Sequence, residues 1–275
     1  MPVARTTILT RVAAYRRPTL RYHTKAMQLL GLEGRISTTA RNALDDVESR
    51  VKRTLPASVR EWYELENAVQ LLFQHSNADP PVDIGKLGEP LRDTLGGPHD
   101  LVAQNLLVIR HENQGACVWA VLLDGSDDPP VVLDLDTQFK TWTKCASSFS
   151  QHVYAWMWDY SQVLAEHRML VQAQNPPLSE MALSSLSERF ERECVTYGWP
   201  GHTQHRFYRG DQRILVWANI KQADWWLSAK TQESLESAVK LVSPLDSVGK
   251  AFWSNDAEGQ AVLKRVRSTP SSSPD

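Results

Sequence analysis

The middle of the chain carries the clearest pattern of hydrophobic and polar positions. Three apolar runs separated by turn residues precede an amphipathic segment: 105–110 (NLLVIR), 117–125 (CVWAVLLDG), 131–135 (VVLDL) and then 147–164. The second run is apolar at almost every position, which is typical of a strand covered on both faces. Residues 126–130 (SDDPP) supply turn chemistry between the second and third runs. This order predicts an antiparallel meander closed by a helix, and it favours a binding module because no catalytic pattern crosses it.

Two segments before the meander have helical spacing. The first spans residues 37–51, where Ser37 or Thr38 can cap the helix. The second follows Pro56, and Ser58 and Glu61 have the spacing of a capping box. Its apolar stripe is wide enough to be half buried and consists of Val59, Trp62, Tyr63, Leu65, Val69, Leu72 and Phe73.

The segment Asn-Pro-Pro at residues 175–177 marks a boundary. Beyond it, the pattern predicts a helix, two strand-like runs and a second helix: 182–197, 206–219, 223–231 and 234–241. This pattern predicts a small C-terminal αββα appendage to the main domain. The predicted division is a basic N-terminal extension (1–35), a main domain (36–170), the αββα unit (178–262) and a disordered tail (263–275).

Composition bounds the class of protein. The chain has 275 residues, 42% hydrophobic and 23% charged, which is typical of a globular protein. No apolar run reaches the roughly 18 residues of a membrane-spanning helix, so no membrane partner is expected. Its three cysteines, Cys117, Cys145 and Cys194, are too far apart for a disulfide framework, which favours a reducing, cytoplasmic location. His202 and His205 add one close pair of possible ligands, which we interpret as exposed loop histidines, so neither a metal nor a cofactor is expected.

Charge is unevenly distributed along the chain. Residues 1–35 hold seven basic residues and one acidic residue, whereas residues 36–165 hold 18 acidic and 10 basic residues. An acidic domain with a basic arm would attract basic partners to its acidic face. The arm has three interpretations: an organellar transit peptide, a nucleic-acid contact, or a poorly ordered extension. We favour the extension and expect no nucleic-acid partner.

Residues 55–68 (LPASVREWYELENA) resemble the opening motif of the SUKH superfamily, the Smi/Knr-type domain, in which Leu-Pro begins a helix that ends near Asn-Gly. Later segments resemble the family in order and spacing: NLLVIRHENQG its first main strand and glycine turn, DDPPVV its strand entry, and ASSFSQHVYAWMWD its closing helix. The resemblance covers about residues 37–165. Ala68 departs from it, because glycine is usual there and a left-handed helix end would strain alanine.

The resemblance implies an α+β fold whose central antiparallel sheet is flanked by helices. It also implies a binding role without catalysis. Bacterial members are often immunity proteins that occupy toxins, frequently nucleases, and fungal members act as interaction hubs in cell-wall regulation.

The candidate protein-binding residues are six carboxylates and one tryptophan: Glu61, Glu64, Glu66, Asp124, Asp127, Asp128 and Trp142. The three glutamates lie away from the apolar stripe, as an acidic patch for a basic toxin or as a solvated helix face. The aspartates surround the 126–130 turn, whose sequence lacks the ligand order of a calcium loop. Turn chemistry accounts for them as well as recognition does. Trp142 follows polar residues and is either an interface anchor or a lid on the sheet.

Three hypotheses follow. The first is an immunity protein that blocks a toxin with a basic active site. The second is a regulatory or scaffold protein of the same fold without a toxin partner. The third is a metal-dependent hydrolase that uses the acidic turn at Asp127 and Asp128. Known catalytic and nucleotide-binding motifs are lacking, which favours the non-enzymatic hypotheses.

Overall fold

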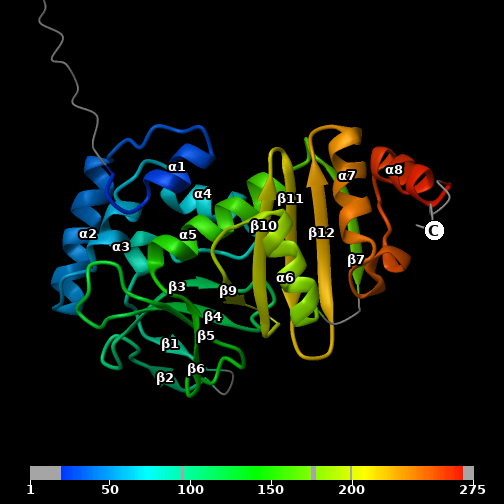
Figure 1. The fold of residues 1–275 in the computed structure, drawn as a ribbon. Coiled ribbons are helices and arrows are strands. Elements are labelled where there is room, and N and C mark those ends of the chain that lie inside the picture. Colours follow the sequence, from blue (N-terminus) through cyan, green and yellow to red (C-terminus); the bar gives the residue numbers. More distant parts are fainter. Residues whose placement is uncertain (1–19, 94–95, 175–177, 199, 269–275) are drawn as a thin grey trace, which may run out of the picture.

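The computed structural model describes residues 20–93, 96–174, 178–198 and 200–268. They form two sheet-based units that lie side by side (Figure 1). The first unit contains α1–α5 and β1–β6, and the second contains β7–β12 and α6–α8. The prediction of an α+β fold with a central antiparallel sheet flanked by helices is confirmed.

The sheet of the first unit is the predicted antiparallel meander. Its four strands follow one another in sequence order: β3 (Leu106–His111), β4 (Val118–Leu122), β5 (Val131–Asp134) and β6 (Trp142–Ala146). Buried Asp134 ends β5, and its carboxylate accepts the backbone N–H groups of Asp136, Thr137 and Phe139. This carboxylate therefore fixes the turn that leads into β6.

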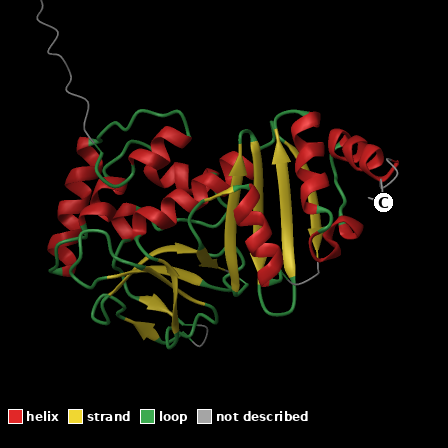
Figure 2. Ribbon diagram, in the orientation of Figure 1, coloured by secondary structure: helices red, strands yellow, loops and turns green. Residues whose placement is uncertain are grey.

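Five helices cover this sheet (Figures 1 and 2): α1 (Thr24–Leu29), α2 (Thr38–Val51), α3 (Ala57–Tyr63), α4 (Ala68–Gln74) and α5 (Phe149–Trp158). Ser37 and Ser148 cap α2 and α5 through their hydroxyl oxygens. Trp62 and Phe149 are fully buried between the helices and the sheet. Between α4 and β3 lie three short elements: η1 (Ile84–Lys86), β1 (Leu91–Arg92) and β2 (Pro98–His99).

The left-handed conformation expected at Ala68 lies one residue earlier, at Asn67. The left-handed residue is Asn67, with φ of 62°, and Ala68 is the first residue of α4. Asparagine tolerates this conformation better than alanine does, because its short polar side chain can bond locally. The strain predicted for Ala68 is therefore absent.

The second unit is built on a larger antiparallel sheet with the order β7-β12-β11-β10-β8, and β9 pairs with β10. Its strands are β7 (Met169–Gln174), β8 (Glu191–Arg192), β9 (Thr196–Gly198), β10 (His202–Arg209), β11 (Gln212–Ala218) and β12 (Ala223–Ala229). Its helices are α6 (Glu180–Arg189), α7 (Gln232–Val242), the 3₁₀ segment η3 (Leu245–Ala251) and α8 (Ala257–Ser268).

Both faces of this sheet are covered. Ile214 and Val216 of β11 pack with residues of α6 and α7 on one face. Leu215 and Trp217 alternate with them and point to the opposite face, where Leu215 packs against Trp158 at the end of α5. The π-helix η2 (Asp159–Val163) contacts β11 and β12 on that same face. The second sheet thus packs against α5 and η2 of the first unit.

The C-terminal unit differs from the predicted αββα appendage. The run 206–219 is a hairpin, since Gly210 has φ of +56° and reverses the chain between β10 and β11. Strand β7 pairs with β12 across about 55 residues, so the predicted boundary at residue 170 falls inside this strand. Pairing at such separation leaves no local sequence signal.

Both predicted termini are also more ordered than expected over their described parts. Ala26 and Met27 of α1 are buried in the first core, so residues 20–35 are not a loose extension. Helix α8 continues to Ser268, and Leu263 is buried, so the tail does not begin at residue 263. The rest of the basic arm, 1–19, and residues 269–275 lie outside the described residues.

Candidate functional site

Glu61 of α3 has a structural role. Its carboxylate accepts the backbone N–H groups of Arg21 at 2.7 Å and of Tyr22 and His23 at 2.9 Å. These three residues lead into α1, so one side chain anchors the chain entering the first helix. The carboxylate that was predicted to face a partner is occupied within the molecule.

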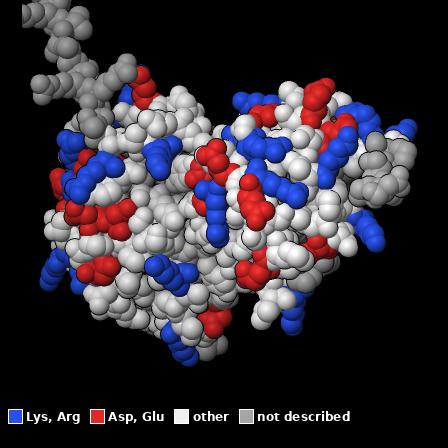
Figure 3. Space-filling view, viewed as in Figure 1, with Lys and Arg blue, Asp and Glu red and all other residues white. Residues whose placement is uncertain are grey.

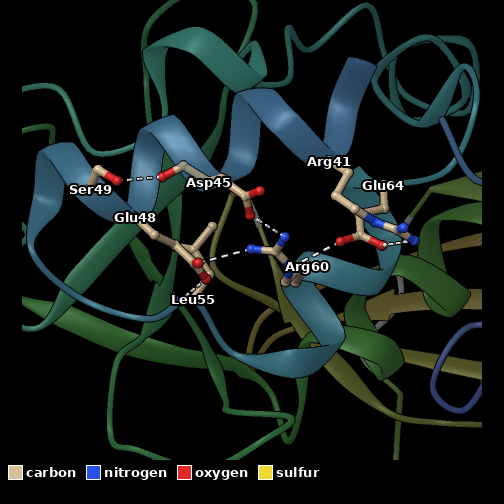
Figure 4. Close-up of polar contacts among 7 residues, drawn as sticks. All are labelled: Arg41, Asp45, Glu48, Ser49, Leu55, Arg60 and Glu64. Carbon is tan, nitrogen blue, oxygen red and sulfur yellow. Dashed lines mark hydrogen bonds and ion pairs between the residues drawn. The ribbon is translucent and has the colours of Figure 1, made fainter. Parts of the chain in front are cut away.

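Glu64 belongs to an ion-pair cluster around Arg60 (Figure 4). Arg60 donates to Glu64 and Glu48 at 2.9 Å and to Asp45 at 2.5 Å, and Arg41 reaches Glu64 at 3.3 Å. This arginine cluster joins α2 to α3. Its charges largely compensate one another, so Glu64 adds little to a net acidic surface.

The predicted acidic turn is also tied to neighbouring groups. Asp124 accepts the backbone N–H and the hydroxyl of Ser126. Exposed Asp127 lies 3.1 Å from the Tyr22 hydroxyl and 3.4 Å from an Arg21 nitrogen. Asp128 accepts the backbone N–H of Ser150 at 3.0 Å and its hydroxyl at 2.5 Å. The turn chemistry interpretation accounts for these contacts.

The remaining two predicted residues lie apart. Trp142 is half-buried at the start of β6 and stacks on Phe139, with ring centroids 6.4 Å apart. Glu66 is exposed beyond α3. Acidic and basic side chains also intermingle over the molecular face in Figure 3. The predicted residues therefore do not converge on one surface.

A cavity of about 260 Å³ lies where the two units meet. Six aromatic residues from α5, η2 and four strands line it: Trp119, Trp156, Tyr160, Tyr197, Trp217 and Trp226. All except Trp119 are half-buried, so the cavity wall is partly open to solvent. We refer to this site as the junction cavity.

The aromatic rings brace one another. Trp156 stacks on Tyr160 at 5.6 Å with an interplanar angle of 7°, and it meets Trp119 edge-on at 5.7 Å. Trp217 and Trp226 of the neighbouring strands also meet edge-on, at 5.1 Å. Such contacts hold ring positions with little freedom, which favours a preformed site.

Two carboxylates reach the junction cavity. Asp79 accepts the Asn113 backbone N–H through Oδ1, and Glu112 accepts those of Gln114 and Ala116 through Oε2. Among the described residues, the second oxygen of each carboxylate has no hydrogen-bond partner. Burial raises the pKa of Asp79 to about 6, against the opposing effect of its bond to Asn113 and of the Arg110 charge.

Cys145 and His152 form a second polar pair in this wall. The Cys145 sulfur lies 3.6 Å from Nδ1 of His152, and both residues are buried. Burial raises the pKa of Cys145 to about 12 and holds the pKa of His152 well below its usual value. Both groups are therefore neutral near pH 7, unlike an activated thiolate pair. His152 Nε2 is buried without a hydrogen-bond partner in the described part of the chain.

Arg110 is a buried cation that acts on this chemistry, and the buried Arg206 is another. The guanidinium carbon of Arg110 lies 4.2 Å from the centroid of the Trp156 ring, and the side chain is fully buried. Burial lowers its pKa to about 10, while Asp79 acts in the opposite direction. The charge of Arg110 thus offsets part of the negative charge of Asp79 and Glu112.

No family model, curated protein or solved structure matches this chain. In the described residues, no group of three or more His, Cys, Asp or Glu side chains is placed to hold a metal ion. No described helix is long and apolar enough to span a membrane.

The junction cavity was not predicted from the sequence, and two histidines of β10 were predicted in the wrong environment. His202 and His205 are buried in β10 and are not exposed loop residues. Their strand carries polar residues on its buried side, including Gln204 and Arg206, so it resembled a loop. The available signal was the ten tryptophans in the sequence, four of which line the site from three strands and from α5.

Proposed function

We propose that this chain is a non-enzymatic protein-binding module and that the junction cavity receives an anchor side chain of its partner. The observation that carries the proposal is the set of half-buried aromatic rings at the junction of the two units. Protein interfaces concentrate binding energy where an anchor fills a water-excluding aromatic pocket. The neutral state of Cys145 and His152 supports binding over nucleophilic catalysis.

The biological role that we propose is toxin immunity, which the resemblance to the SUKH superfamily implies. The meander followed by α5 has the arrangement expected for that family. A bound toxin would lose access to its substrate because the module occupies its active face. A regulatory scaffold role is the alternative, and it differs only in the effect that binding has on the partner.

The hydrolase hypothesis has less support. It placed the metal at Asp127 and Asp128, but these carboxylates contact Arg21, Tyr22 and Ser150. A divalent ion would have to displace these contacts.

The test compares capture of a partner by three forms of the full chain: the native protein, Trp217→Leu in the cavity, and Trp253→Leu outside it. A genuine partner binds the native chain and Trp253→Leu but is at least about tenfold weaker on Trp217→Leu, as expected for an interface anchor site. Equal binding by all three forms would overturn the role of the cavity. Inhibition of the partner's own activity at one-to-one stoichiometry supports immunity, and unchanged activity supports the scaffold role.

A further inference from the structure

The junction cavity combines aromatic walls with two carboxylates that each keep one oxygen free among the described residues. Asp79 directly precedes the 80–111 segment and Glu112 directly follows it, and both residues are more than nine-tenths buried. Buried carboxylates are costly unless a cation or donors satisfy them. The backbone N–H groups satisfy only one oxygen of each. A ligand that supplies positive charge and N–H donors would complete the site.

The rings favour the same ligand chemistry. Trp and Tyr faces attract ammonium and guanidinium groups, most strongly where water is excluded. Trp156 already shows this preference within the molecule, since the Arg110 guanidinium lies 4.2 Å from its ring centroid. Trp217 and Trp226, on the other wall, have no such internal cation in the described structure.

His152 supplies an independent observation. It lines the cavity, is 1% exposed, and has an Nε2 atom without a partner in the described structure. Nε2 accepts a hydrogen bond in the tautomer whose ring proton lies on Nδ1, and donates one in the other tautomer. Burial keeps this imidazole neutral. A neutral imidazole in the cavity wall adds no positive charge that would oppose a bound cation.

We propose that the junction cavity binds an organic cation, an ammonium or guanidinium group whose charge faces Asp79 and Glu112 and whose carbon chain lies against Trp217 and Trp226. This inference rests on the proposed function and assigns a chemical class to the anchor: a lysine or arginine side chain of the partner. A free alkylamine has the same chemistry. Arg110 reduces the attraction, whereas buried Arg206 is already paired with Asp159.

The first experiment uses the full chain and three probes of similar size: n-butylammonium, 1-butanol and butyrate. Titration followed by tryptophan fluorescence and calorimetry reports binding at the site. We expect saturable binding of butylammonium in roughly the millimolar range, as befits so small a ligand. Butanol and butyrate should bind at least about tenfold more weakly. Equal or tighter binding of either one would overturn the inference, as would no binding of butylammonium.

Substitutions of the two carboxylates test whether butylammonium binds in the junction cavity. Asp79→Asn and Glu112→Gln should each weaken butylammonium by about 10- to 100-fold, the cost of losing a charged hydrogen bond. Glu188→Gln removes an exposed carboxylate on α6 and should leave the affinity unchanged. Circular dichroism and the unfolding midpoint verify that each variant is folded. Unchanged affinity in folded Asp79→Asn and Glu112→Gln would overturn the site.

The source of the cation is tested with acetyl-lysine-amide and acetyl-arginine-amide alongside butylammonium. Competition of these probes with a captured partner assigns the cavity to a partner side chain. Binding of the probes without such competition assigns it to a free amine and removes the cavity from the proposed function. A partner that binds while no cationic probe does would contradict this inference and leave the proposed function standing.

Discussion

Asp159 of η2 and Arg206 of β10 form a bidentate ion pair, with two N···O distances of 2.7 Å and both side chains almost fully buried. The pair joins the end of α5 in the first unit to the sheet of the second. Arg206 also donates to Thr196 at 2.9 Å, and Thr196 donates to Gln204 at 2.6 Å. This network fixes the wall of the junction cavity that β9 and β10 provide.

Breaking this pair should cost much of the stability. We expect Asp159→Asn to lower the free energy of unfolding by about 3–5 kcal/mol, because it leaves Arg206 buried without its counter-charge. The double variant Asp159→Asn with Arg206→Met should recover part of the loss. Urea unfolding measures both. The control Glu236→Gln, at the surface with ion pairs to Lys240 and Arg265, should change stability by at most about 1 kcal/mol. A loss of that small size in Asp159→Asn would contradict the structural role.

Glu61→Ala should loosen the chain before α1. It removes three exposed or part-buried hydrogen bonds to the backbone of residues 21–23. A hydrogen bond to a charged group contributes at most about 1.5–3 kcal/mol, and less where water reaches it. Hydrogen exchange should become faster over residues 21–29, with the meander unchanged. Glu66→Ala is the matched control on an exposed carboxylate. Unaltered exchange at α1 would show that Glu61 does not anchor it.

Asp79 should make the folded protein less stable as pH rises. Its pKa is about 6 in the folded state and near 3.8 when unfolded, so the folded state holds its proton longer. The contribution of Asp79 to the free energy of unfolding is therefore largest below about pH 4, falls between about pH 4 and 6, and is absent at higher pH. The total change is near 3 kcal/mol. In Asp79→Asn this slope should disappear. Unfolding of both forms from pH 4 to 8 measures it, and identical slopes would refute the shift.

Asn67 should be sensitive to substitution by ordinary residues. At φ of 62°, Asn67→Ala should cost about 1 kcal/mol, and Asn67→Gly should be neutral or stabilising. Gln70→Ala, on the exposed side of α4, provides the control. Thermal unfolding distinguishes the three. A stable Asn67→Ala variant would mean that the left-handed residue carries no strain.

Local pattern was sufficient to predict the meander, α2 and α5. The stripe from Val59 to Phe73 predicted one helix, but the structure has α3 and α4 there, separated by left-handed Asn67. Strands β3–β5 are short apolar runs separated by turn residues, and Ser37 caps α2 as the sequence indicates. These features depend on residues close in sequence, where periodicity and capping chemistry are informative.

The junction cavity could not be predicted in this way. Asp79, Glu112, His152 and Trp226 are brought together only by the packing of one unit on the other. The opposite mistake was made for most of the candidate carboxylates, which were predicted to bind a partner but bind other parts of the chain. Glu61 and Asp128 look like free surface charges in sequence, but backbone N–H groups in distant segments occupy them. Which acid serves the fold and which serves binding is decided by tertiary contacts.

Both units contribute side chains to the wall of the junction cavity, so ligand binding there and the packing of the two units on each other depend on one another. Trp119 and Trp156 belong to one unit and Trp217 and Trp226 to the other, so a small relative rotation would dismantle the recess while each core stayed intact. Thermodynamic reciprocity then requires any occupant to resist that rotation by the same free energy that the rotation would cost it. Under mechanical load or mild denaturant, release of the occupant should therefore precede global unfolding.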